Sequence, residues 1–208
     1  MPNKSFFSFI ASLQESLLGS GIMLLLMLPV VIAYFPAYLP DWSYTFLFGL
    51  SLFAAFLVMA IRPLADLLTR IAWIRPLVIL RKGFGVLSAS IIVGIMLSKF
   101  MTDGFIYALD FFSPERWSLA GGAVLAPVSD LSALLLLTTS NRFSKRVLGK
   151  NWKRIQKLAY VYFYAGALYE YLVLGQILAL IAVTLVTVLV CAAYAKNRSI
   201  RAIIPRTV

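Results

Sequence analysis

Two acidic residues in strongly apolar surroundings stand out chemically in this sequence. Asp130 lies within the apolar stretch 118–139, and Glu170 lies near one end of the stretch 157–174. A charged side chain at the centre of a bilayer costs about 2.5–3.5 kcal/mol on insertion scales, so Asp130 should face other helices and be paired or protonated. A proton or ion relay and a neutral, hydrogen-bonded Asp130 both fit this pattern. A relay needs a second titratable group within the membrane, and Glu170 is the candidate.

Small residues surround Asp130 at helical spacing. Ser118, Gly122, Ala126 and Asp130 recur every four residues, which predicts a helix face suited to close packing. Pro127 should leave the carbonyl group four residues earlier without its helical donor. Further small residues, Ser90, Gly94 and Ser98, give the stretch 84–100 a similar face.

Tyrosines are concentrated in the stretch 157–174. It contains Tyr160, Tyr162, Tyr164, Tyr169 and Tyr171. Tyrosines at the ends of a membrane span fit interfacial anchoring, whereas a deep tyrosine such as Tyr164 should find a hydrogen-bond partner. A redox-active tyrosine chain is an alternative to aromatic packing, which the sequence favours.

Most kinds of catalytic site lack their residues here. The chain has no histidine, which removes the commonest general base, metal ligand and haem ligand. Its single cysteine, Cys191, excludes an internal disulfide and a cysteine-built metal cluster. Arg81-Lys82-Gly83-Phe84-Gly85 is too short for a dinucleotide fingerprint. We therefore predict no catalytic residues, no metal site and no cofactor, and we favour a protein that is not an enzyme.

The composition points to lipid as the solvent. Of 208 residues, 62% are hydrophobic and 13% charged, against roughly 45–50% and about 25% in soluble domains. Crossing the hydrocarbon takes about 20 apolar residues. Six stretches qualify: 18–39, 44–61, 84–100, 118–139, 157–174 and 176–195. The last two meet at Gly175, where the absence of a Cβ atom favours a tight turn.

The distribution of basic residues predicts how these spans are oriented. Seventeen basic residues fall on one side: Lys4, Arg62, Arg70, Arg75, Arg81, Lys82, Arg142, Lys145, Arg146, Lys150, Lys153, Arg154, Lys157, Lys196, Arg198, Arg201 and Arg206. Only Lys99 and Arg116 fall on the other side. The positive-inside rule makes the first side cytoplasmic. We therefore predict an all-α bundle of six transmembrane helices with both termini inside. The net charge of +11 reflects topology and attraction to anionic lipid, and we predict no nucleic-acid partner.

Three regions follow from this layout. Residues 1–17 form an amphipathic interfacial segment with an apolar stripe that includes Phe6, Phe9, Ile10, Leu13 and Leu17. Residues 18–195 form the six-span membrane domain, and residues 196–208 form a basic cytoplasmic tail. A second interfacial stripe is predicted after Pro63. Aromatic residues on the other side should lie at the lipid headgroups: Phe105, Tyr107, Phe111, Phe112 and Trp117.

Two groups of motifs resemble the ferric-reductase-like transmembrane domain, in particular the haem-binding membrane subunit of the bacterial periplasmic methionine sulfoxide reductase system. The first comprises Arg62-Pro63-Leu64, Arg81-Lys82 and Gly85. The second comprises Leu137-Thr138-Thr139-Ser140-Asn141, Arg146-Val147-Leu148-Gly149, Trp152-Lys153-Arg154-Ile155 and Lys157-Leu158-Ala159-Tyr160. The resemblance covers about residues 50–175. It implies six spans in a bacterial inner membrane, and electron transfer through b-type haem held by histidines on spans three and five.

The positions equivalent to the family's histidines are Ile95, Gln156 and Tyr169. None of them can supply an imidazole. Met96, Met101, Lys99 or Tyr169 could ligate iron in principle, so haem b is an alternative. Without haem, side chains must fill the space, and Tyr164, Tyr169, Met96 and Phe163 are the candidates.

The sequence therefore predicts a haem-free, ferric-reductase-like membrane protein that serves as a non-catalytic accessory subunit of a larger membrane complex. Its expected partners are the lipid bilayer and other membrane subunits. One alternative is a transmembrane electron-transfer subunit with non-histidine haem or flavin binding. Another is a proton or ion pathway centred on Asp130.

Overall fold

The computed structural model describes the backbone of residues 4–203 and the side chains of residues 5–141 and 143–198. Residues 1–3 and 204–208, and with them Arg206 of the predicted basic tail, lie outside the described residues. Over residues 4–203 the regular elements are helices and no strand is present, so the predicted all-α class is confirmed.

Six longer helices dominate the fold. They are α1 (Lys4–Tyr34), α2 (Ser43–Leu67), α4 (Arg81–Asp103), α6 (Leu125–Thr139), α9 (Leu158–Leu172) and α10 (Ile177–Ile203). Short helices connect them: α3 (Ile74–Leu77), α5 (Phe105–Phe111), α7 (Arg142–Leu148) and α8 (Trp152–Ile155). Single 3-10 turns are η1 (Pro36–Tyr38), η2 (Val78–Leu80), η3 (Ala120–Gly122) and η4 (Gly149–Asn151).

Five helical segments within the described residues are long and apolar enough to cross a membrane: Ser5–Tyr34, Ser43–Leu67, Ile74–Asp103, Ala120–Thr139 and Ile177–Arg198. The chain is thus a membrane protein. The predicted fifth span corresponds to α9, which has 15 residues. Such a helix rises about 22 Å, less than the hydrocarbon thickness of about 30 Å, so length and composition alone do not make α9 a sixth span.

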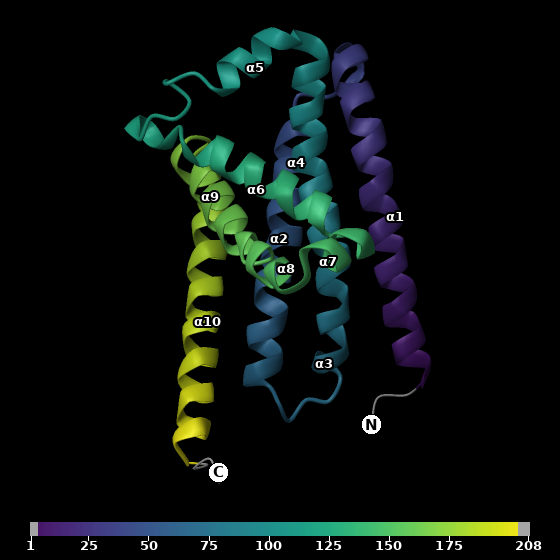
Figure 1. Ribbon diagram of the computed structural model, residues 1–208, viewed down its shortest axis with the longest axis vertical. Coiled ribbons are helices and arrows are strands. Elements are labelled where there is room, and N and C mark those ends of the chain that lie inside the picture. Colours follow the sequence, from purple (N-terminus) through teal and green to yellow (C-terminus); the bar gives the residue numbers. More distant parts are fainter. Residues whose placement is uncertain (1–3, 204–208) are drawn as a thin grey trace.

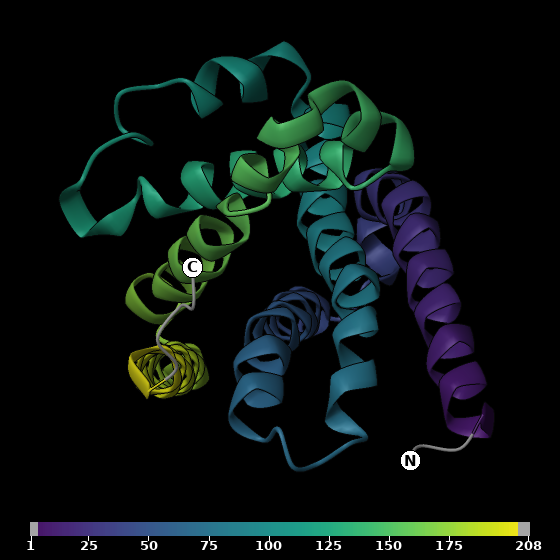
Figure 2. The same ribbon diagram turned by 60° about the horizontal axis from the view of Figure 1, so that its bottom comes forward.

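The long helices run in alternating directions along the molecule (Figure 1). The start of α1, the link between α2 and α3, and the end of α10 lie at the lower end, and α5 lies at the upper end. Helices α6 and α9 are inclined, and α7 and α8 between them lie about halfway along the long axis. In both views α2 and α4 lie between α1 and α10 (Figure 2).

Small residues form much of the core where α2, α4, α6, α9 and α10 meet. Ala55, Ala89 and Ala133 are buried there beside Phe163 and Val186. Helices in lipid gain little from the hydrophobic effect, because lipid tails are as apolar as leucine. Small side chains that permit close backbone contact are therefore favoured between them.

Glycines bring α1 and α4 into close contact. A Cβ atom at Gly83 would lie 2.9 Å from the Cβ of Leu17, and one at Gly94 would lie 3.2 Å from the Cβ of Leu28. From the other side, a Cβ at Gly21 would lie 3.2 Å from the backbone of Leu87. The predicted small-residue face around Gly94 therefore packs against α1.

The fourth predicted span is shorter than expected. Gly121 (φ 63°) and Gly122 (φ 78°) adopt left-handed conformations, so the helix does not extend through them. The predicted four-residue repeat on one helix is therefore wrong for Ser118 and Gly122. Pro127 lies in the first turn of α6, where proline is tolerated.

Two details follow from this late start of α6. The carbonyl group of Ala123, predicted to lack a donor, accepts a hydrogen bond from the backbone N–H of Ala126 at 3.3 Å. Asp130 lies in the second turn of α6, two residues before the midpoint of the helix.

The predicted interfacial segments continue the long helices. Residues 4–17 belong to α1 without a break, and Ile10 from their apolar stripe is only 2% exposed. Helix α2 likewise runs through Pro63 to Leu67. Gly175 has φ 69° between α9 and α10, which confirms the predicted turn.

Candidate functional site

A cavity of about 340 Å³ lies between α4, α5, α6 and α9. Its charged and phenolic lining residues are Lys99, Tyr107, Arg116, Asp130, Tyr169 and Glu170. The larger apolar side chains on its wall are Phe48, Ile92, Ile95, Met96 and Val173. Both acids singled out in the sequence therefore line one cavity.

Close packing of α6 against α9 brings the two acids together. A Cβ atom at Gly166 of α9 would lie 3.0 Å from the Oγ of Ser129 on α6. Asp130 follows Ser129 in the chain, and Glu170 lies one helical turn after Gly166. The glycine thus permits the approach that places both carboxylates at the same end of the helix pair.

The side chain of Glu170 is almost fully enclosed yet has a polar atom without a partner. Its residue is 5% exposed, and its Oε2 atom accepts no hydrogen bond. Burying an unpaired polar group costs about 1–3 kcal/mol, and more for a charged one. Glu170 therefore lines the cavity and carries a buried carboxyl oxygen without a hydrogen-bond partner.

Two cations border the same cavity. Lys99 is exposed at its edge, and Arg116 lies on the segment after α5. Both attract the carboxylate of Asp130. The one ion pair among the described side chains, however, joins Arg116 to Asp110 at 2.8 Å. Lys99 is thus the cation of the cavity that no ion pair engages.

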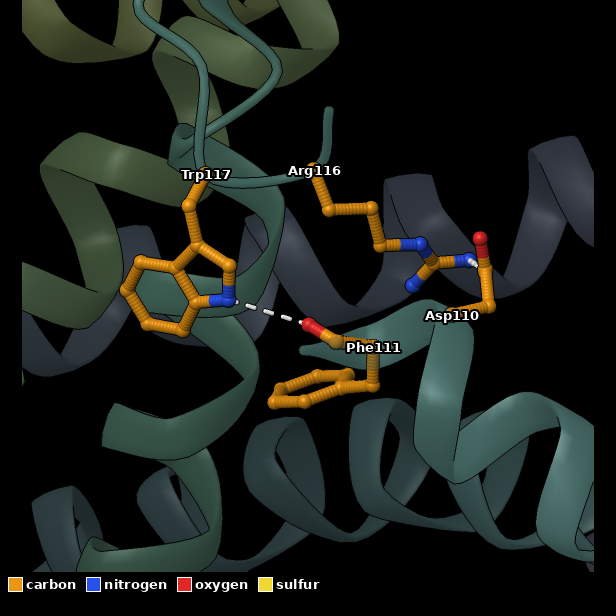
Figure 3. A network of polar contacts seen from close by, with 4 residues as sticks. All are labelled: Asp110, Phe111, Arg116 and Trp117. Carbon is orange, nitrogen blue, oxygen red and sulfur yellow. Dashed lines mark hydrogen bonds and ion pairs between the residues drawn. The ribbon is translucent and has the colours of Figure 1, made fainter. Parts of the chain in front are cut away.

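Tyr107 of α5 and Arg116 of the segment that follows α5 line the cavity. Figure 3 shows the contacts that hold this segment against α5. The indole Nε1–H of Trp117 donates a hydrogen bond to the carbonyl oxygen of Phe111 at 3.0 Å, beside the Arg116–Asp110 ion pair. The guanidinium carbon of Arg116 lies 5.3 Å from the ring centre of Tyr107. Burial raises the pKa of the Tyr107 phenol, and the negative charge of Asp130 raises it further.

The predicted headgroup aromatics of this region divide into two groups. Phe105 and Phe112 are 73% and 71% exposed, as expected of side chains that meet lipid headgroups. Tyr107 and Phe111 are buried instead, at 7% and 6% exposure. Part of the aromatic cluster therefore packs inside the protein.

Two of the three positions that the sequence resemblance would equate with haem ligands lie at this cavity. Ile95 (5% exposed) and Tyr169 line it from α4 and α9, together with Met96. Gln156 lies at the end of α8, outside the cavity lining, and its buried Nε2 atom has no partner.

These residues do not fit axial ligation of haem. Ile95 has no atom that could ligate iron, and Tyr169 offers a single phenolic oxygen. Met96 neighbours Ile95 in the chain and so points from a different face of α4. Of the other predicted gap-filling residues, Phe163 is 1% exposed in the core, and the Tyr164 hydroxyl lies 2.9 Å from the Oγ1 of Thr187 on α10.

A second polar cluster, which sequence reasoning missed, lies in the core. The hydroxyl of Tyr162 on α9 is 2.9 Å from the Oγ of Ser51 on α2 and 2.7 Å from the Oγ of Ser88 on α4. All three residues are buried. The sequence signal for this cluster was the presence of isolated serines in the apolar stretches of α2 and α4. Serine is unfavourable at positions that face lipid, so these serines indicate contacts between helices.

The described residues contain no group of three or more His, Cys, Asp or Glu side chains that could hold a metal ion. Comparisons with protein-family models, curated proteins and solved structures find no match to this chain. Function must therefore be inferred from the cavity and from the residues that line it.

Proposed function

We propose that the protein is a haem-free, six-span membrane protein of the bacterial inner membrane, built on a ferric-reductase-like scaffold. It serves as a non-catalytic subunit of a larger membrane assembly. The observation that carries this proposal is the chemistry at Ile95 and Tyr169. They are the positions at which the resemblance would place haem ligands, and they border a common cavity from α4 and α9, but they supply no pair of iron ligands.

Helix direction and charge support the six-span part of this proposal. The start of α1 and the end of α10 lie at the same end of the molecule, as an even number of crossings requires (Figure 1). The sequence assigns seventeen of the nineteen basic residues to the side of the termini in the six-span layout. Seven of them lie in residues 142–157, around α7 and α8, which are about halfway along the long axis (Figure 1). Reporter fusions at Asp41 and Asp110 should read outside, and a fusion at the C-terminus should read inside. Five crossings would place the C-terminus outside.

Visible absorption tests the haem-free assignment. The protein purified with its native lipids should show no Soret band in proportion to its concentration. A variant with both Ile95→His and Tyr169→His is the matched control, because it places an imidazole at two cavity-lining positions, one on α4 and one on α9. Haem binding by this variant, and not by the unmodified protein, would support the proposed ferric-reductase-like scaffold. A stoichiometric b-type spectrum of the unmodified chain would favour the electron-transfer alternative.

Co-purification tests the subunit role. Extraction in a mild detergent should retain the same membrane proteins in a fixed ratio, as identified by mass spectrometry. A monodisperse chain without partners, from membranes in which it is expressed at its natural level, would contradict this role.

One observation favours a second candidate, the proton or ion pathway. Asp130 and Glu170 line a common cavity, which supplies the second titratable group that a relay needs. Proton or sodium flux into liposomes should then fall in an Asp130→Asn variant. Asp103→Asn, at an exposed position outside the cavity lining, is the control. Equal flux in all three proteins would exclude the pathway.

A further inference from the structure

We propose that residues 142–157, which include α7, η4 and α8, bind the headgroups of anionic phospholipids. These residues are called the α7–α8 segment below. The lipid phosphate groups bind at its lysine and arginine side chains, and its exposed apolar side chains enter the acyl-chain region beside them. This binding goes beyond the proposed function and needs neither haem nor a partner subunit.

The α7–α8 segment concentrates positive charge that the protein does not neutralise. No acidic residue lies between Asp130 and Glu170 in the chain. The described cations of the segment, from Lys145 onward, are exposed, and the one ion pair among the described side chains joins Arg116 to Asp110 elsewhere. Charge complementarity therefore favours an anionic partner for this segment. Its seven basic residues are Arg142, Lys145, Arg146, Lys150, Lys153, Arg154 and Lys157.

Two cations near other helix ends already have partners within the protein. The Nζ of Lys196 on α10 donates hydrogen bonds to the carbonyl oxygens of Asp66 and Leu67, at 3.2 and 2.7 Å. The Nε of Arg81 donates a hydrogen bond to the carbonyl oxygen of Val58 at 2.9 Å. The described cations of the α7–α8 segment donate no such side-chain hydrogen bond to the protein, so their donors are available to an external acceptor.

Contacts with the end of α6 hold the α7–α8 segment in place. The indole Nε1–H of Trp152 donates a hydrogen bond to the carbonyl oxygen of Thr139 at 3.0 Å, and the Nζ of Lys145 lies 5.4 Å from the centre of the Trp152 ring. The Oδ1 of Asn141 accepts a hydrogen bond from the backbone N–H of Ser144 at 2.6 Å, which caps the start of α7. The cations therefore extend from a folded element and not from an extended loop.

The position of the segment in the chain brings it to a membrane surface. It closely follows Ala120–Thr139, which is long and apolar enough to cross a membrane. Phe143 and Val147 lie one turn apart on α7 and are 74% and 67% exposed, so they share a helix face. Cations beside exposed apolar side chains are typical of segments at the membrane interface. Because zwitterionic lipids carry no net charge, anionic headgroups are the favoured partner.

Fluorescence quenching by brominated lipids tests this inference. The full-length protein is reconstituted in phosphatidylcholine nanodiscs that contain brominated phosphatidylglycerol or brominated phosphatidylcholine at increasing mole fraction. Since Trp152 lies within the segment, we expect the phosphatidylglycerol to quench at lower mole fraction, with a relative binding constant of about tenfold. Trp152→Phe should abolish this preference. Trp73→Phe, exposed between α2 and α3, is the control and should retain it.

Matched charge variants make the result specific to this segment. The site variant replaces three of its exposed cations by glutamine and should lose the preference for phosphatidylglycerol: R146Q, K150Q and K153Q. The control variant removes the same charge between the end of α2 and the first turn of α4 and should keep the preference: R70Q, R75Q and K82Q. Inorganic phosphate at constant ionic strength should not reduce the quenching, because it has no acyl chain. Size-exclusion profiles and circular dichroism establish folding, and single substitutions replace a triple variant that aggregates.

Three results would overturn the inference. They are equal quenching by the two brominated lipids, a preference that persists in the folded site variant or in Trp152→Phe, and an equal loss in the two charge variants. The last result would assign the preference to the whole basic side of the protein. Absence of the preference, together with loss of co-purifying proteins from the site variant, would assign the segment to an acidic protein partner. None of the lipid measurements depends on haem absorption or on the number of spans.

Discussion

Removal of the Tyr162 hydroxyl should destabilise the protein measurably but modestly. The Tyr162→Phe substitution deletes the two hydrogen bonds that join α9 to Ser51 on α2 and Ser88 on α4. Interhelical hydrogen bonds in a membrane protein average about 0.6 kcal/mol each, so the two predict a loss of about 1.2 kcal/mol. The serines do not become orphans. The Ser88 Oγ still donates to the carbonyl oxygen of Ser51 at 2.8 Å, and the Ser51 Oγ still donates to the carbonyl oxygen of Ser88 at 3.2 Å.

The unfolding free energy in bicelles, measured by steric trapping, provides the assay. Tyr164→Phe is the matched control, because its hydroxyl contacts only Thr187 at an exposed position and should cost about 0.6 kcal/mol or less. A double-mutant cycle with Ser88→Ala isolates the coupling between the two side chains. Equal losses for Tyr162→Phe and Tyr164→Phe would refute the reasoning that burial makes the core cluster the stronger link. A loss of unfolding free energy above about 3 kcal/mol for Tyr162→Phe would refute the assumption that the two hydrogen bonds contribute additively.

Three further substitutions test the packing of the helices and the connection near the cavity. Gly83→Ala should destabilise the protein by about 1–3 kcal/mol in the same unfolding assay, because the new Cβ would lie 2.9 Å from the Cβ of Leu17. Gly49→Ala is the control: its new Cβ would meet open space, so the substitution should be neutral or stabilising. Gly121→Ala should cost about 1–2 kcal/mol through its left-handed backbone alone, since no atom lies within 4 Å of its Cβ. Trp117→Phe should lose the bond to Phe111 and speed proteolysis of residues 112–119, with Trp42→Phe, at an exposed position, as the control.

The long apolar helices could be predicted from the sequence because each depends on local composition. Helices α1, α2, α4 and α10 lie where hydropathy placed them, and the turn at Gly175 follows from one residue without a Cβ. Helix ends were less accurate. Helix α2 does not end at Pro63 but continues to Leu67. Helix α6 does not begin with the apolar stretch at residue 118, because Gly121 and Gly122 have left-handed backbone conformations.

The cavity could be predicted only in part. Apolar surroundings identified Asp130 and Glu170, but their common cavity depends on the contact between Gly166 and Ser129, which no local pattern encodes. The Tyr162 cluster was missed for the same reason, since its three residues come from helices far apart in the sequence. Hydroxyl groups within apolar helices indicate that partners exist, but the fold decides which partners.

The short lengths of α6 and α9 have a consequence for the surrounding lipid. If both cross the membrane, as the six-span proposal holds, α9 offers about 22 Å of rise. Helix α6 reaches the length of a span only together with the residues from Ala120 that precede it, whereas α1, α2 and α10 are longer helices. Inclination shortens their reach along the bilayer normal still further (Figure 1). The hydrophobic mismatch is relieved when lipid tails beside α6 and α9 compress, or when the basic side chains of α7 and α8 extend toward the phosphate groups. Under the six-span proposal, the bilayer should therefore be thinner beside α6 and α9 than beside the other helices, and the protein should partition into thinner membrane regions.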